Sequence, residues 1–204
     1  TIAALILWLI WPVKIFSALF YGALILLLFS LFFFRDPQRQ VTSRSNCLVS
    51  PADGKVIAIK ENVSHPVTGE ASCFLAIFLA ITNVHVNRYP IAGKVKSVNY
   101  KKGRFLAAFN PDAGDLNEQY VINFESVYGM VQMRQIAGII ARRLVCNARV
   151  GDKVSVGEKF GLMKFSSRID LYFPMSGKLQ VEVGEKVRGG ESVLAFFPEQ
   201  YNED

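Results

Sequence analysis

The chain contains few side chains that could carry out a reaction. It has two histidines, His65 and His85, which are too few for a histidine-rich metal centre. Its three cysteines, Cys47, Cys73 and Cys146, lie far apart, with neither the paired spacing of a zinc site nor the density of a disulfide framework. We therefore expect buried, reduced thiols and no metal site, and any chemistry must be done with few groups.

The candidate acid and base groups occur in patterns that are also typical of structural residues. Asp53 is followed by Gly54, a pair that on its own usually marks a turn. His85 lies in an apolar run, where a single histidine more often packs into a core. His65 precedes Pro66 in a loop-like segment and is interpreted as a surface residue. Neither pattern alone selects a function.

Two segments near the C-terminus repeat one pattern. Residues 150–158 read VGDKVSVGE and residues 183–191 read VGEKVRGGE. The repeat predicts two strand–turn units related by pseudo-symmetry, with tight turns at Gly151-Asp152 and Gly184-Glu185. The pattern resembles the flattened β-sandwich of lipoyl and biotinyl carrier domains.

A carrier domain would present a modified lysine at the hairpin between the repeats, and Lys164 follows Met163 in that interval. The Glu-Ala that precedes Met-Lys in biotinyl domains is missing, and Lys164 falls early relative to the first repeat. The residues nearer the expected hairpin tip are Ser166 and Ser167. The interval therefore favours a role for the serine pair over a carrier lysine.

The N-terminal region reads as a membrane anchor. Residues 15–34 are twenty consecutive residues without a charge, which as a helix would span about 30 Å, the thickness of a bilayer core. The preceding uncharged run ends at Pro12 and Lys14, which we expect to interrupt a continuous span, so the two runs could form one helix or a re-entrant hairpin. A cleaved signal peptide is disfavoured, because no basic segment precedes the apolar run.

Charge predicts the orientation and the class of partner. Arg35, Arg39 and Arg44 follow the apolar run, whereas Lys14 is the charge on its other side, so the globular part is expected on the cytoplasmic side of the cell membrane. The net charge of +6 favours an anionic partner. Basic residues are scattered and form no recognised binding motif, which argues against nucleic acid.

We expect residues 1–34 to be the anchor and residues 35–204 to be one mostly β domain with short helices. Short runs rich in Val, Ile and Phe alternate with Gly, Asp, Asn and Pro, which is typical of strands and turns. The stretch 139–145 is the best candidate for a helix, although a buried strand fits it equally well.

Several separated motifs of the chain resemble one family, the short, pyruvoyl-dependent phosphatidylserine decarboxylases. The resemblance extends over residues 30–198. The motifs are FFRDPQR at 33–39, SPADGKV at 50–56, VHVNR at 84–88, GKV at 93–95, QIAG at 135–138, ARR at 141–143 and FSSRID at 165–170.

The resemblance implies a chain that cuts itself between Ser166 and Ser167, giving fragments 1–166 and 167–204 that stay associated. The hydroxyl of Ser167 would attack the carbonyl of the preceding peptide bond, and elimination and hydrolysis of the resulting ester would leave a pyruvoyl group on residue 167. Such a hydroxyl needs a base. His85 is the better of the two histidines for this role, and Asp53 would orient it and stabilise its charged form, as in catalytic triads.

The same resemblance implies decarboxylation of phosphatidylserine to phosphatidylethanolamine without a metal or a diffusible cofactor. The pyruvoyl group would bind the amine of the lipid and accept the electrons released with CO2. A second histidine found in larger family members is replaced here by Thr82, which leaves the proton donor open. Candidates for contact with the lipid phosphate are Arg88, Lys94, Arg142 and Arg143, for which structural salt bridges are an equal alternative.

Ser166 departs from the family pattern, which has glycine before the reactive serine. Glycine suits a strained scissile bond because it adopts backbone conformations that other residues avoid. Two alternatives to the enzyme therefore stay open. One is a lipid-binding relative that neither cuts itself nor catalyses a reaction. The other is a membrane-anchored, lipoyl-like adaptor protein. Such an adaptor should carry a long coiled coil between the repeats, and the interval here is too short to hold one. The sequence leaves the oligomeric state, including a homo-oligomer, open.

Overall fold

The computed structural model describes residues 2–42, 46–139 and 143–199, with side chains from Lys14 onward. It divides into two compact units, Thr1–Arg35 and Asp36–Asp204, which we describe separately.

The first unit is a single α-helix, α1 (Ile2–Phe33). Within the described part of the chain, Lys14–Phe33 is the stretch that is long and apolar enough to cross a membrane, with a mean hydropathy of 2.4. The backbone stays helical through Pro12, so the expected interruption and the hairpin alternative are wrong. Proline removes one helical hydrogen bond, and long apolar helices tolerate that loss. An apolar helix that could anchor the protein to a membrane is confirmed.

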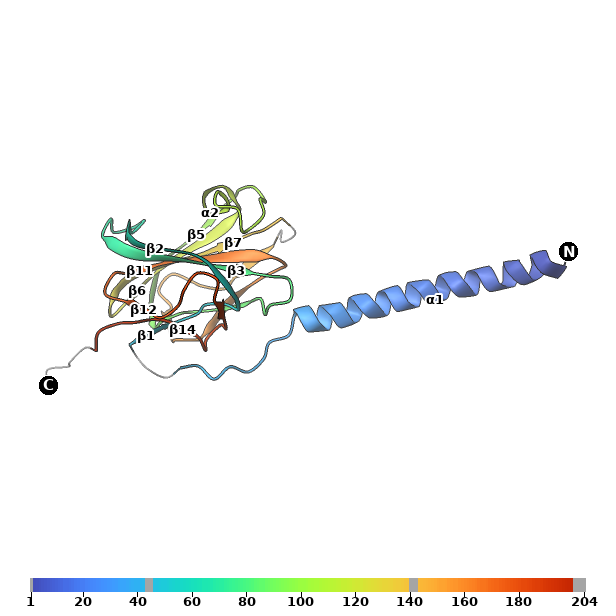
Figure 1. Cartoon of the computed structure of the whole chain (residues 1–204), viewed down its shortest axis with the longest axis horizontal. Coiled ribbons are helices and arrows are strands. Elements are labelled where there is room, and N and C mark those ends of the chain that lie inside the picture. The colour runs from blue at the N-terminus through green and yellow to red at the C-terminus, as the bar shows by residue number, and fades with distance from the viewer. Residues whose placement is uncertain (1, 43–45, 140–142, 200–204) are drawn as a thin grey trace. The chain divides into compact units, whose positions relative to one another are not determined.

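The second unit is mostly β, as predicted. Its main sheet is curled and has eight strands in the order β13-β2-β3-β11-β7-β6-β5-β9, and two small sheets have the orders β1-β14-β12 and β4-β10-β8. Figure 1 shows α2 on one side of the main sheet and β1, β12 and β14 on the other. The bounds are β1 Cys47–Val49, β2 Gly54–Ser64, β3 Ala71–Leu79, β4 Val86–Arg88, β5 Gly93–Lys101, α2 Ala113–Leu116, β6 Gln119–Ser126, β7 Gly129–Ile136, β8 Leu144–Cys146, β9 Lys153–Val154, β10 Lys159–Met163, β11 Ser167–Pro174, β12 Lys178–Leu179, β13 Lys186–Val187 and β14 Val193–Phe196.

The predicted repeat forms the two edges of the main sheet. Its copies supply β9 and β13, which pair in the same way with the first residues of β5 and β2: Val154 lies opposite Gly93, and Val187 lies opposite Gly54. Both predicted turns are present, with Gly151 at φ 94° and Gly184 at φ 101°. The main sheet therefore consists of two similar halves, β13-β2-β3-β11 and β9-β5-β6-β7, each given from its edge to the centre. The two small sheets, β1-β14-β12 and β4-β10-β8, correspond to each other in the same two-fold pattern.

The core lies on the inner face of the curled sheet. Side chains alternate between the two faces of a strand, so Ile169, Leu171 and Phe173 of β11 point into the core, where all three are fully buried. The stretch 139–145 is not helical in its described residues, because Leu144–Cys146 pairs with β10 as strand β8. Residues 140–142 lie outside the described part.

Candidate active site

Ser167 is the first residue of the central strand β11 and lies opposite Leu79 of β3. By strand alternation its side chain shares the inner face with Ile169, and it is fully buried. Its Oγ has no hydrogen-bond partner among the described residues. A buried hydroxyl without a partner destabilises a fold by about 1–3 kcal/mol, so such a group is unusual outside functional positions.

The peptide that precedes Ser167 is conformationally constrained. Phe165 has φ 60°, a left-handed conformation that costs a residue with a side chain about 1–2 kcal/mol. Ser166 does not have a positive φ. The glycine-like conformation therefore falls one residue earlier than the family pattern led us to expect, and serine fits at position 166 in the uncut chain.

The carbonyl group of Ser166 is in tight contact with the backbone of Gly138. A methyl group placed on Gly138 would overlap the Ser166 oxygen and would lie 3.1 Å from its carbonyl carbon. The same methyl group would lie 3.4 Å from the Cβ of Ala108. Position 138 therefore requires glycine, a requirement that nothing in the sequence indicates beyond the QIAG motif at 135–138.

His85 is fully buried and is connected to the chain that leads to Ser167. Its backbone oxygen accepts a hydrogen bond from the N–H of Met163 at 3.1 Å. Its Nδ1 lies 2.9 Å from the backbone oxygen of Asn83. Because a carbonyl oxygen can only accept, Nδ1 carries the proton in the neutral ring, and Nε2 is then the basic nitrogen. This is the tautomer that a general base needs.

Asp53 lies at the same end of the sheet, immediately before Gly54 of β2. Its carboxylate accepts hydrogen bonds from Nη2 of Arg39 at 2.8 and 2.9 Å and from the N–H of Gly189 at 2.9 Å. The side chains of Arg39 and Asp53 are 8% and 14% exposed. The structure thus brings Asp53 to Arg39 and does not give it a hydrogen bond to His85.

The contact of Arg39 could not be predicted from the sequence, in which Arg39 is one of the positive charges that follow the apolar run and a member of the FFRDPQR motif at 33–39. A second ion pair, at 3.5 Å, connects Arg39 to Glu191 of the second repeat. The segment that follows the anchor is therefore attached to the same end of the sheet as Asp53.

The three described candidates for lipid phosphate contact lie in different places. Arg88 is buried and donates to the backbone oxygen of Gly157 at 3.0 Å and to Asp36 at 3.4 Å; burial lowers its pKa. Lys94 is on β5, separated from β11 by β6 and β7. The backbone oxygen of Arg143 accepts a hydrogen bond from the backbone N–H of Lys164, near the serine pair. Arg142 lies outside the described residues.

The prediction that His65 is a surface residue is wrong, since its side chain is buried. Its Nδ1 accepts hydrogen bonds from the backbone N–H groups of Val67 and Thr68, and its ring packs against Tyr172. Burial lowers the pKa of the ring. His65 therefore stabilises its own loop.

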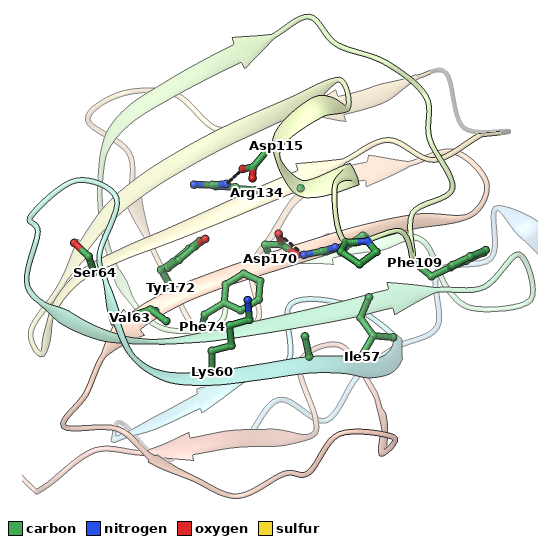
Figure 2. Close-up of a pocket in the computed structure, with 14 residues that line it drawn as sticks. Ile57, Lys60, Val63, Ser64, Phe74, Phe109, Asp115, Arg134, Asp170 and Tyr172 are labelled. Atoms are coloured by element: carbon green, nitrogen blue, oxygen red, sulfur yellow. Dashed lines mark hydrogen bonds and ion pairs between the residues drawn. The ribbon is translucent and has the colours of Figure 1, made fainter.

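The outer face of β11 lines a separate pocket of about 500 Å³ (Figure 2). Asp170 lies at its base in a buried ion pair with Arg168, whose Nη2 donates at 3.0 Å. Burial raises the pKa of Asp170, and Arg168 opposes this effect. Figure 2 also shows Arg134 pointing toward Asp115, 3.7 Å away, and its guanidinium lies 5.0 Å from the ring centroid of Tyr172. Alternation places this pocket on the face opposite Ser167.

Comparisons with known proteins agree with the motifs. The model of the phosphatidylserine decarboxylase family matches residues 26–195. Three similar relatives, each named phosphatidylserine decarboxylase proenzyme, come from Chlorobaculum parvum (40% identical, over 89% of this chain and 84% of the relative), Prosthecochloris aestuarii (43%, over 86% and 81%) and Syntrophus aciditrophicus (44%, over 83% and 80%). This chain belongs to the phosphatidylserine decarboxylase family.

Proposed function

We propose that this protein decarboxylates phosphatidylserine to phosphatidylethanolamine with a pyruvoyl group that it makes from its own Ser167. The observation that carries the proposal is the buried Ser167 hydroxyl, which has no hydrogen-bond partner in the described structure and follows a constrained peptide. The relatives are named as proenzymes, which supports a precursor that must be converted. When formed, the pyruvoyl group supplies an electron sink for the loss of CO2.

Self-cleavage would proceed through chemistry of the chain itself. Oγ of Ser167 attacks the carbonyl carbon of Ser166 and loses its proton to a base, the C–N bond breaks, and an ester and a free amine result. A base then removes the Cα proton of residue 167, the Cα–Cβ double bond forms and the Cβ–Oγ bond breaks, so that Ser166 leaves as a carboxylate. One water hydrolyses the remaining enamine, after tautomerisation, to the pyruvoyl group and ammonia. The products are fragments 1–166 and 167–204.

His85 is our candidate for the base, because its Nδ1 contact with Asn83 leaves Nε2 as the basic nitrogen. Asp53 is our candidate for the group that orients His85 and stabilises its charged form. The hydrogen bonds of Asp53 go to Arg39 and Gly189, and its Oδ2, which accepts one of them, can accept another.

The two fragments should stay associated after the cut, because the small fragment keeps the central strand of the main sheet. Ser167–Pro174 pairs with β3 along its whole length and with β7 from Arg168 to Tyr172. These backbone contacts do not depend on the peptide bond between the two serines.

We propose that the substrate reaches the site from an anionic cell membrane, with the β-domain on its cytoplasmic side. The proposed contacts to the lipid phosphate are those of Arg143 and Arg142, with Lys94 and Arg88 as the alternatives. Arg88 is the weakest of the four, since its guanidinium is already engaged by Gly157 and Asp36.

Intact mass spectrometry of the purified full chain, together with an assay for phosphatidylethanolamine, tests the proposal. The parent should give fragments 1–166 and 167–204, and the small one should resist Edman degradation because a pyruvoyl terminus has no amine. Ser167→Ala should give one uncut, inactive chain. A parent that stays uncut and inactive would instead favour a lipid-binding relative without catalysis.

A further inference from the structure

We propose that Gly138 is a positioning residue for self-cleavage, because its backbone holds the carbonyl group that Ser167 attacks. The inference rests on the proposed function and assigns the packing against the scissile peptide to the segment that follows β7, 28 residues before Ser166 in the chain. A side chain at this position would displace the Ser166 carbonyl and slow the first chemical step.

The contact leaves no space for a β-carbon. A methyl group on Gly138 would overlap the Ser166 oxygen and would meet its carbonyl carbon at 3.1 Å, a distance shorter than most contacts of real β-carbons. On another side it would meet the Cβ of buried Ala108 at 3.4 Å. Because protein interiors are close-packed, the Ser166 carbonyl would have to move.

Asn117 fixes the segment that carries Gly138. This side chain is fully buried and uses its amide group completely: it donates to the backbone oxygens of Ala137 at 2.7 Å and Leu106 at 2.8 Å, and accepts from the N–H of Leu106 at 2.9 Å. The N–H of Ala137 donates to the oxygen of Glu118 at 2.9 Å. Both backbone polar groups of Ala137, the residue before Gly138, are therefore hydrogen-bonded, so the segment cannot move away from Ser166 without breaking these bonds.

The position of the Ser166 carbonyl matters because the attacking oxygen follows it directly in sequence. Phe165, on the other side of the peptide, already has a left-handed conformation. The contact with Gly138 then restricts the direction of the Ser166 C=O bond. It thereby determines which face of the Ser166 carbonyl carbon is turned toward the Ser167 hydroxyl. Displacing reacting atoms by about 1 Å can slow a reaction about 100-fold, which is the size of effect expected here.

Gly93 provides a matched control for the substitution. A methyl group there would also strike a backbone carbonyl, 2.5 Å from the oxygen and 3.1 Å from the carbon of Glu125. Gly93 begins β5 in the other half of the main sheet, whereas Gly138 faces the serine pair. The two Gly→Ala changes therefore impose similar clashes with a backbone carbonyl. The clash at position 138 lies next to the cleavage point, and the clash at position 93 lies in the other half of the sheet.

The experiment follows fragment formation by the full-length chain, newly synthesised in the presence of lipid vesicles, together with its unfolding midpoint. We expect Gly138→Ala to cut about 100-fold more slowly than the parent. Gly93→Ala should lower the midpoint by a similar amount yet cut within about threefold of the parent rate. Equal cutting by the two variants would overturn the role of Gly138. An uncut parent would instead refute the proposed function.

Hydroxylamine locates the blocked step, because it cleaves the ester that follows attack by Ser167. The Gly138→Ala precursor should release no fragments on treatment, since the proposed block precedes the ester. Release of both fragments would show that attack had proceeded, and would overturn the inference.

Asn117→Ser tests the same contact without placing a group against Ser166, and so keeps the inference falsifiable if Gly138→Ala does not fold. Loss of the hydrogen bond to Ala137 should slow cutting about tenfold. Asn123→Ser is its control: this buried amide donates to Ser97 at 2.7 Å, away from the serine pair, and its loss should leave the rate unchanged. Parent-like cutting by a folded Asn117→Ser chain would count against the inference.

Discussion

Replacing Arg168 with methionine should destabilise the β-domain by about 3–5 kcal/mol, because it leaves the carboxylate of Asp170 buried without its cation. The two side chains are 7% and 2% exposed, and the guanidinium donates two hydrogen bonds to the carboxylate. Although both side chains line the outer pocket, the carboxylate is almost wholly removed from water. The loss should therefore be far larger than that of a surface ion pair.

The loss should also depend on pH in a defined direction. Burial raises the pKa of Asp170 above its ordinary value of 3.8, and Arg168 is the main influence that opposes the rise. Removing Arg168 therefore raises this pKa further. A carboxyl group whose pKa is raised by folding contributes stability below its unfolded pKa and loses it as the pH rises through the folded pKa. The deficit of Arg168→Met should accordingly be greatest at neutral pH and should shrink on acidification.

Urea unfolding of the full-length chain in detergent micelles, followed by near-UV circular dichroism at several pH values, measures both effects. Lys96→Met is the matched control, because Lys96 pairs with Glu125 on the surface, where their side chains are 45% and 53% exposed. That variant should have an almost unchanged midpoint. Replacing Asp170 by leucine in the Arg168→Met background should recover much of the stability. If Arg168→Met and Lys96→Met have the same midpoint at neutral pH, the reasoning about the buried pair is wrong.

Four further outcomes are expected. His85→Ala should slow self-cleavage at least about 100-fold, and Asp53→Ala less, in gel assays of new chains; parent-like cutting by His85→Ala would exclude it as the base. Ser166→Gly should cut within about tenfold of the parent in the same assay, because Ser166 lacks a positive φ; a much larger acceleration would show that the serine strains the site. The protein should pellet with membranes after a high-salt wash, since Lys14–Phe33 is apolar, and recovery in the supernatant would contradict anchoring. A chelator should leave decarboxylation intact, and loss of activity that zinc restores would refute the metal-free mechanism.

The parts of the fold that the sequence predicted are those set by local patterns. The repeat predicted turns at Gly151 and Gly184, because glycine adopts the positive φ that they require. Short apolar runs separated by Gly, Asp, Asn and Pro predicted strands. The interruption expected at Pro12 did not occur, because the apolar residues on both sides continue the helix. The stretch 139–145 was ambiguous because its apolar run fits either element, and pairing with β10 decided in favour of a strand at Leu144–Cys146.

Contacts between distant segments could not be predicted in this way. Ser167 and His85 were identified from motifs, but nothing local to Arg39 or Asp53 shows that they meet, since strand register and chain path bring them together. His65 was assigned to the surface because its loop is polar, whereas its ring packs against Tyr172 after folding. The need for glycine at 138 follows from one tertiary contact with the Ser166 carbonyl group, which no periodicity encodes.

The two-fold pattern of the β-domain explains why the proposed chemistry belongs to one end of the sheet. Ser167 opens β11 opposite the last residue of β3, and Gly129 opens β7 opposite the last residue of β6. Asp53 precedes the first residue of β2, and Ala92 occupies the corresponding place before β5. Of these two similar sheet ends, one has the hydroxyl of Ser167 and the carboxylate of Asp53, whereas Gly129 and Ala92, at the equivalent positions of the other, can neither attack a carbonyl nor hold a charge. The single proposed cleavage point is therefore set by side-chain identity on a nearly symmetric backbone.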